Sequence, residues 1–135
     1  MARRIGAVVA GLFGSFILIT AVQAVGTWLY PPPPGTDFTD PESVAALMAQ
    51  IPLGALLMVE LSYAVGSLGG GAIVRRVSPE RANALAVVLG GLLTLAGFAN
   101  LATIPHPLWF AVLSTVTYVP CALLGALAVA RLRAG

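Results

Sequence analysis

Four apolar runs, each long enough to cross a lipid bilayer, constrain this sequence more than any other feature. An α-helix rises about 1.5 Å per residue, so about 20 apolar residues span the roughly 30 Å of hydrocarbon. Only 9% of the 135 residues are charged, and 59% are hydrophobic; a soluble domain carries about 25% charged residues. The sequence therefore predicts one all-α integral membrane domain, a bundle of four transmembrane helices over residues 5–30, 51–74, 82–104 and 108–130.

The first run has a competing interpretation as a secretory signal peptide. Val22, Gln23 and Ala24 resemble a cleavage site after an apolar core,. The run of about 25 residues is, however, longer than the 7–15 apolar residues of a typical signal core. We therefore expect the first transmembrane helix here.

The loop after the first run contains the signals for a short additional helix. Four prolines at residues 31–34 end the first helix and favour a stiff, extended chain,. Asp40 then precedes Pro41 and Glu42, which together supply a capping acid, a first-turn proline and a negative charge at the positive end of the helix dipole,. This pattern predicts a proline-rich outer loop followed by a short interfacial helix over residues 41–50.

The arginines predict the orientation in the membrane. Loops on the cytoplasmic side carry an excess of basic residues. Here the chain ends and the turn between the second and third runs hold every basic residue, whereas the two opposite loops hold none; the arginines are Arg3, Arg4, Arg75, Arg76, Arg81, Arg131 and Arg133. We expect a multi-pass protein of the bacterial inner membrane with both termini in the cytoplasm.

One acidic residue interrupts the second run. Glu60 lies nine residues after Ile51, so a helix places its carboxyl about 14 Å deep, near the middle of the bilayer,. A charge at that depth costs at least about 2.5 kcal/mol and usually faces a partner or a water-filled cavity. Two interpretations follow: a neutral or hydrogen-bonded carboxyl that ties helices together, or a proton- or cation-linked site on a substrate pathway.

Other polar residues lie at a similar depth. Counted from the outer ends of their helices, Thr94 and Tyr118 lie about 15 Å deep and Gln23 about 10 Å deep, with Asn100 shallower,. We expect these four residues and Glu60 to form the ligand or ion pathway. Their depths do not indicate which of them face one another.

The sequence argues against several kinds of chemistry. It contains no lysine for a Schiff base, and Cys121 and His106 are its only cysteine and histidine, so one chain lacks the ligands of a typical zinc site,. A single carboxyl without a nucleophile or a second acid is poor catalytic machinery. We expect no enzyme activity, catalytic residue, metal or cofactor, and no nucleic-acid partner, because the arginines flank apolar helices. His106, between two prolines, is expected in a tight turn, with a pH-sensitive role as the alternative.

Small residues recur at helical spacing in every run. The densest group is in the second run, where Gly66 and Gly70 form a GxxxG motif followed by Gly71. Such residues let helix backbones approach closely in lipid. We expect them to pack inside the bundle, and the alternative is that this stripe faces a second copy or another membrane protein.

Three segments resemble a known group of proteins. Residues 29–33 (LYPPP), 52–57 (PLGALL) and 104–107 (IPHP) are similar to segments of small bacterial four-span inner-membrane proteins of no known function. The resemblance implies the four-span fold and brings no activity. Small multidrug transporters and dual-topology fluoride channels are similar in size only. The transporters carry their essential acid in the first helix, where this chain has Gln23, and the phenylalanine-rich third helix of the channels is absent here.

These observations favour a non-enzymatic transporter, channel or small-ligand-binding protein with a polar site around Glu60. The alternative is a structural or accessory membrane subunit that oligomerises or docks a partner through its glycine-rich helix faces. A cavity lined by Glu60 would favour the first function. A dry Glu60 beside an exposed glycine stripe would favour the second.

Overall fold

The computed structural model describes residues 1–135 and contains α-helices, one short 3-10 helix and no strand. Four helices are long and apolar enough to cross a membrane, which confirms the predicted four-helix membrane fold. The membrane-spanning helices are α1 (Ala2–Leu29), α3 (Leu53–Val77), α4 (Ala82–Thr103) and α5 (Leu108–Ala134); the short elements are α2 (Pro41–Ala49) and η1 (Pro79–Arg81).

The helix ends lie within four residues of the expected positions. The largest difference is at α5, which continues to residue 134 instead of ending at 130. Arg131 and Arg133 therefore belong to the last turns of this helix, where positive charge interacts favourably with the negative end of the helix dipole,.

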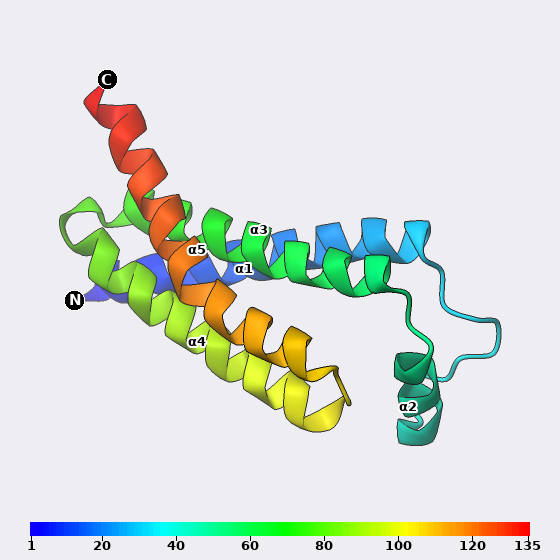
Figure 1. Ribbon diagram of the computed structural model, residues 1–135. Coiled ribbons are helices and arrows are strands. Elements are labelled where there is room, and N and C mark those ends of the chain that lie inside the picture. Colours follow the sequence, from blue (N-terminus) through cyan, green and yellow to red (C-terminus); the bar gives the residue numbers. More distant parts are fainter.

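The helix α3 is the centre of the bundle. It contacts α1, α4 and α5, whereas α1 and α5 do not contact each other. Figure 1 shows α1 and α3 running side by side, with α4 and α5 as a second pair that runs obliquely to the first. The N terminus, the α3–α4 turn and the C terminus lie toward one end, which we call the arginine end. The proline-rich loop, α2 and the α4–α5 turn lie toward the other, which we call the loop end (Figure 1).

The start of α2 has the expected cap, and the preceding loop is tied to it. The Asp40 carboxylate accepts hydrogen bonds from the backbone N–H groups of Glu42 and Ser43, at 3.3 and 3.2 Å. The backbone N–H of Asp37 donates to the Ser43 hydroxyl at 2.9 Å. The Asp37 carboxylate in turn accepts from the hydroxyl and the backbone N–H of Thr39, and these bonds lower the pKa of Asp37,. The loop between α1 and α2 is therefore held by a local polar network.

The glycines of α3 are covered by helices of the same chain. A Cβ atom on Gly66 would lie 2.9 Å from the carbonyl oxygen of Ser15 in α1, and Gly70 faces the same residue. A Cβ atom on Gly71 would lie 2.7 Å from the carbonyl carbon of Ala122 in α5. All three glycines are buried. They let α3 approach α1 on one face and α5 on the other, so this stripe is not open to a second copy.

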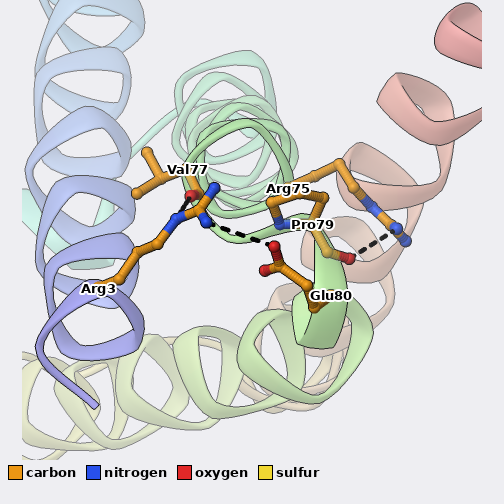
Figure 2. A network of polar contacts seen from close by, with 5 residues as sticks. All are labelled: Arg3, Arg75, Val77, Pro79 and Glu80. Carbon is orange, nitrogen blue, oxygen red and sulfur yellow. Dashed lines mark hydrogen bonds and ion pairs between the residues drawn. The ribbon is translucent and has the colours of Figure 1, made fainter.

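Two arginines connect the elements at the arginine end. Figure 2 shows Arg3 of α1 donating from Nε to the carbonyl oxygen of Val77 at 2.7 Å and from Nη1 to the Glu80 carboxylate at 3.3 Å. Both side chains of the Arg3–Glu80 ion pair are more than half exposed. Such surface pairs contribute about 0–1 kcal/mol. The pair therefore positions the α1 start against η1 more than it stabilises the fold.

The side chain of Arg75 joins four elements. Its Nε donates to the carbonyl oxygen of Ala126 in α5 at 3.1 Å, and its Nη1 donates to the carbonyl oxygen of Pro79 in η1 at 3.3 Å (Figure 2 shows the second bond). Its Nη2 donates to the Asn83 side chain in α4 at 2.6 Å. One guanidinium at the end of α3 thus fixes η1, α4 and α5 around it.

Candidate functional site

A cavity of roughly 230 Å³, partly open at the molecular surface, is lined by residues of all four membrane-spanning helices. Each of these helices contributes one uncharged, hydrogen-bonding side chain to its lining: Gln23 from α1, Tyr63 from α3, Asn100 from α4 and Tyr118 from α5. The rest of the lining is apolar or small: Phe16, Ile19, Leu93, Ala96 and Gly97. We call this the polar cavity.

Tyr63 lines the polar cavity and contacts two of its other polar residues. Its hydroxyl accepts a hydrogen bond from the side-chain N–H of Asn100, at 3.3 Å. Its ring lies 5.3 Å from the ring of Tyr118 and 6.3 Å from that of Phe110, both in tilted arrangements that aromatic pairs favour,. Because Tyr63 and Tyr118 are 9% and 4% exposed, their rings are fixed by packing while their polar ends face the cavity.

A glycine on α4 makes room for the Tyr118 phenol. A Cβ atom on Gly97 would lie 2.8 Å from the Tyr118 hydroxyl oxygen and 2.9 Å from a carbon of its ring. About two helical turns from Gly97 toward the arginine end, a Cβ atom on Gly90 would lie 2.6 Å from the Cα atom of Val119,. The α4 glycines therefore permit both the close α4–α5 contact and the position of Tyr118 in the polar cavity.

Gln23 lines the polar cavity and also a second cavity. Its Nε2 donates to the hydroxyl of Ser62 at 3.2 Å, and that hydroxyl donates to the carbonyl oxygen of Val59 at 2.5 Å. Gln23 also lines a cavity of roughly 410 Å³ at the loop end, and it is the one residue common to the two linings. The loop-end cavity is partly open and is lined by the last turns of α1, the proline-rich loop, α2 and the start of α3; its other polar side chains are Thr27, Tyr30 and Gln50.

Glu60 lies outside both cavities. It faces α5, and only 8% of the residue is exposed. Its Oε1 atom makes a hydrogen bond with the hydroxyl of Thr117, and its Oε2 atom is buried without a partner. The structure therefore separates Glu60 from the polar cavity with which it was expected to form one site. Glu60 and Tyr63 are three residues apart and are neighbours on α3, but the Glu60 carboxyl turns toward Thr117 of α5 and does not line the cavity,.

Thr94 is also outside the polar cavity. Its hydroxyl donates to the carbonyl oxygen of Gly90 on its own helix, at 2.8 Å. Of the five residues expected to form a pathway, the cavity thus brings together Gln23, Asn100 and Tyr118.

Tyr63 was not among the candidates from the sequence. The available signal was its place in the middle of a membrane-spanning helix, because tyrosine is enriched at the two interfaces and not at the centre of such helices. Its position three residues after Glu60 put it in the same layer of the bundle.

His106 lies in the α4–α5 turn. Its Nδ1 atom is 2.7 Å from the carbonyl oxygen of Ile104, and its ring stacks on that of Phe110 with centroids 5.0 Å apart. These contacts hold the imidazole against the bundle at the loop end. They fit a turn residue whose ring covers the buried Phe110.

The chain has no group of three or more His, Cys, Asp and Glu side chains that could hold a metal ion. Comparisons with protein-family models, curated proteins and solved structures returned no match.

Proposed function

We propose that this protein binds a small, uncharged molecule inside the bilayer, in the polar cavity. The observation that carries the proposal is that each of the four spans contributes one hydrogen-bonding side chain to the same space of roughly 230 Å³. Polar groups inside a membrane protein are costly, and they mark binding sites and substrate pathways by default. Convergence from four helices onto one cavity is the arrangement expected of a binding site between the helices of a bundle.

The lining indicates the chemistry of the ligand. It contains two phenols and two amides but no charged side chain, so it suits a neutral molecule. Asn100 keeps its side-chain oxygen and one N–H beyond its bond to Tyr63, and Gln23 keeps its side-chain oxygen,. The aromatic faces of Tyr63 and Tyr118 favour an apolar, planar body. The ligand class is therefore a mostly apolar molecule with one or two carbonyl or hydroxyl groups.

Binding fits this lining better than catalysis does. The polar cavity holds no pair of a nucleophile and a base and no pair of carboxyls, which are the usual parts of a hydrolytic or transfer site,. The docking alternative has less support, because Gly66, Gly70 and Gly71 are covered by α1 and α5 of the same chain.

The loop-end cavity supplies an approach to the polar cavity. We infer that the protein lies in a bacterial inner membrane with the arginine end in the cytoplasm and the loop end outside; the distribution of arginines supports this orientation,. A ligand from the outer side would first meet the loop-end cavity and then Gln23, which borders both spaces. Two cavities that share Gln23 would serve one kind of transport, namely uptake or transfer of the ligand across the outer half of the bilayer.

Photolabelling with benzophenone tests the proposal. Benzophenone is an uncharged aromatic ketone that inserts into nearby C–H bonds on illumination, so it serves both as ligand mimic and as crosslinker. In lipid nanodiscs we expect saturable adducts on residues of the polar cavity, located by mass spectrometry. Gly97→Val would displace the Tyr118 phenol from its place against α4 and should abolish these adducts.

Two variants test the hydrogen bonds and one serves as control. Tyr63→Phe and Asn100→Leu each remove polar groups from the lining, and each should weaken labelling by about 1 kcal/mol, or roughly fivefold in Kd,. Thr103→Val is the control, because Thr103 lies on the same helix and bonds only to backbone oxygens of α4. Labelling that does not saturate, or that is the same in all four variants, would contradict ligand binding in the polar cavity.

A further inference from the structure

The contact between Glu60 and Thr117 is a polar site that the proposed ligand binding does not use. It lies where α3 meets α5, outside the polar cavity. The two carboxyl oxygens of Glu60 have different surroundings, since Oε1 is bonded to the Thr117 hydroxyl and Oε2 is buried with no hydrogen-bond partner. The position of the hydrogen atoms decides what this site holds.

The Thr117 hydroxyl has one hydrogen and two neighbouring acceptors. Its oxygen is bonded to Oε1 of Glu60 and also lies 2.8 Å from the carbonyl oxygen of Leu113, one turn back along α5. A threonine hydroxyl supplies one hydrogen, and a carbonyl or an ionised carboxylate supplies none. With an ionised Glu60, one of the two oxygen–oxygen contacts would therefore lack a hydrogen.

The other serine and threonine hydroxyls of α5 indicate which acceptor the Thr117 hydrogen is bonded to. Ser114 and Thr115 each donate to the carbonyl oxygen four residues earlier, at 2.8 and 2.7 Å. This back-bonding is the usual local pattern of serine and threonine in a helix. If Thr117 donates to Leu113 in the same way, the hydrogen in its contact with Glu60 has to come from the carboxyl,.

The surroundings of Glu60 offer no positive charge. The titratable groups that lie close enough to interact with its charge are Tyr63, Tyr118 and Cys121, all neutral acids. On the outer side of the same contact, neighbouring side chains are apolar and exposed toward the lipid: Leu57, Leu61, Leu113 and Val116. An ionised carboxylate here would have no counter-charge nearby, and its Oε2 atom is buried without a hydrogen-bond partner,.

We propose that Glu60 and Thr117 form a proton-binding site between α3 and α5, separate from the polar cavity. The Glu60 O–H donates to the Thr117 hydroxyl, which donates to the Leu113 carbonyl oxygen. Release of the proton leaves a charge between two helices and requires Thr117 to turn its hydrogen from Leu113 to Glu60. Proton binding at Glu60 is thereby coupled to the contact of α3 with α5.

Carbodiimide labelling tests whether Glu60 is a neutral acid within the lipid. Dicyclohexylcarbodiimide is lipid-soluble and reacts with protonated carboxyls, so in nanodiscs at neutral pH it should label Glu60. The chain has five side-chain carboxyls, and the other four lie outside the spans: Asp37, Asp40, Glu42 and Glu80. A water-soluble carbodiimide should label those four and leave Glu60 unmodified. The four carboxyls outside the spans thus serve as an internal control for the labelling of Glu60. Glu60→Gln should lose the lipid-soluble label.

Infrared difference spectroscopy tests the pairing with Thr117. Glu60→Gln should remove the C=O band of a protonated carboxyl at neutral pH. Thr117→Val should shift that band to higher frequency because the hydrogen bond is lost, and Thr117→Ser should restore it. Thr115→Val is the matched control, since Thr115 makes the same back-bond without a bond to Glu60. The absence of the protonated band would overturn the proton-binding site, and a band unaffected by Thr117→Val would overturn its assignment to this pair. Neither result depends on ligand binding in the polar cavity.

Discussion

The closest backbone contact in the bundle, between α3 and α5, permits a quantitative prediction. Two glycines, one on each helix, make this contact. A Cβ atom on Gly71 would lie 2.7 Å from the carbonyl carbon of Ala122, and a Cβ atom on Gly125 would lie 2.7 Å from the carbonyl carbon of Leu68. Both obstacles are backbone atoms, so no rotamer change relieves them. We expect Gly71→Ala and Gly125→Ala each to force α3 and α5 apart.

The distances set the size of the effect. Non-bonded carbon atoms prefer a separation of about 3.5–4.0 Å, and the carbonyl oxygens of Ala122 and Leu68 lie nearer still to the added Cβ atoms, so the helices would have to separate by more than about 1 Å at the contact,. Overpacking of this kind typically costs about 1–3 kcal/mol and occasionally more. Alanine favours the helix over glycine by about 1 kcal/mol in water, and this gain offsets only part of the cost. Each substitution should lower the free energy of unfolding by about 1–3 kcal/mol.

The same chain provides the control. A Cβ atom on Gly91 or Gly6 would meet no atom within 4 Å, although both glycines lie in membrane-spanning helices. Gly91→Ala and Gly6→Ala should therefore leave the free energy of unfolding unchanged or raise it. The measurement is unfolding of the detergent-solubilised protein by increasing the fraction of sodium dodecyl sulfate, followed by circular dichroism. If Gly125→Ala were as stable as Gly91→Ala, the close contact of α3 with α5 would be refuted.

Two further predictions concern the two ends of the bundle. Arg75→Met removes the three hydrogen bonds that hold η1, α4 and α5, so it should lower the free energy of unfolding by about 1–3 kcal/mol,. Arg76→Met, next to it but exposed and without such bonds, should change that free energy by less than about 0.5 kcal/mol; equal effects would contradict the role of Arg75,. At the loop end, Thr39→Val removes the side-chain bond that lowers the pKa of Asp37, so this pKa should rise toward its ordinary value in an NMR titration. Because the pKa of Asp37 is lower in the folded protein than in the unfolded chain, its ionised carboxylate stabilises the ordered loop at any pH above the unfolded-chain value,. This stabilisation is lost as the pH falls through the pKa of Asp37 in the folded protein. Identical titration curves would show that Thr39 does not act on Asp37.

The sequence predicted the elements well because their signals are local. The length of each apolar run determines whether a helix can span the membrane, and prolines and caps mark where helices begin and end. The Asp40 cap and the start of α2 at Pro41 came out as expected. The chain leaves the helical conformation between Ala49 and Leu53, so α2 and α3 are separate helices. The central position of α3 and the oblique α4–α5 pair depend on side-chain packing between distant segments, which one sequence does not reveal.

The prediction of the site rested on the depth of each residue along its helix, and depth does not give the direction in which a side chain points. Gln23, Asn100 and Tyr118 were expected at similar depths, and all three line the polar cavity. Glu60 has the right depth but faces Thr117 on α5. Because successive residues of a helix are rotated by about 100°, depth alone leaves the direction of each side chain open. An amphipathic pattern normally resolves this, but in lipid both the inner and the outer faces of a helix are apolar.

The distribution of small and large residues explains why the cavities lie where they do. Toward the arginine end, Gly11, Gly70, Gly71 and Gly125 bring α1, α3 and α5 into backbone contact. From the middle toward the loop end, large aromatic side chains, Tyr63 among them, separate the helices, and both cavities lie in that part. The backbone contacts are thus closest toward the arginine end, and the polar cavity and the loop-end cavity lie away from them. A molecule bound in the polar cavity, as we propose, would reach the arginine end only if these glycine contacts separated, so transport across the whole membrane would require a rearrangement of α1, α3 and α5.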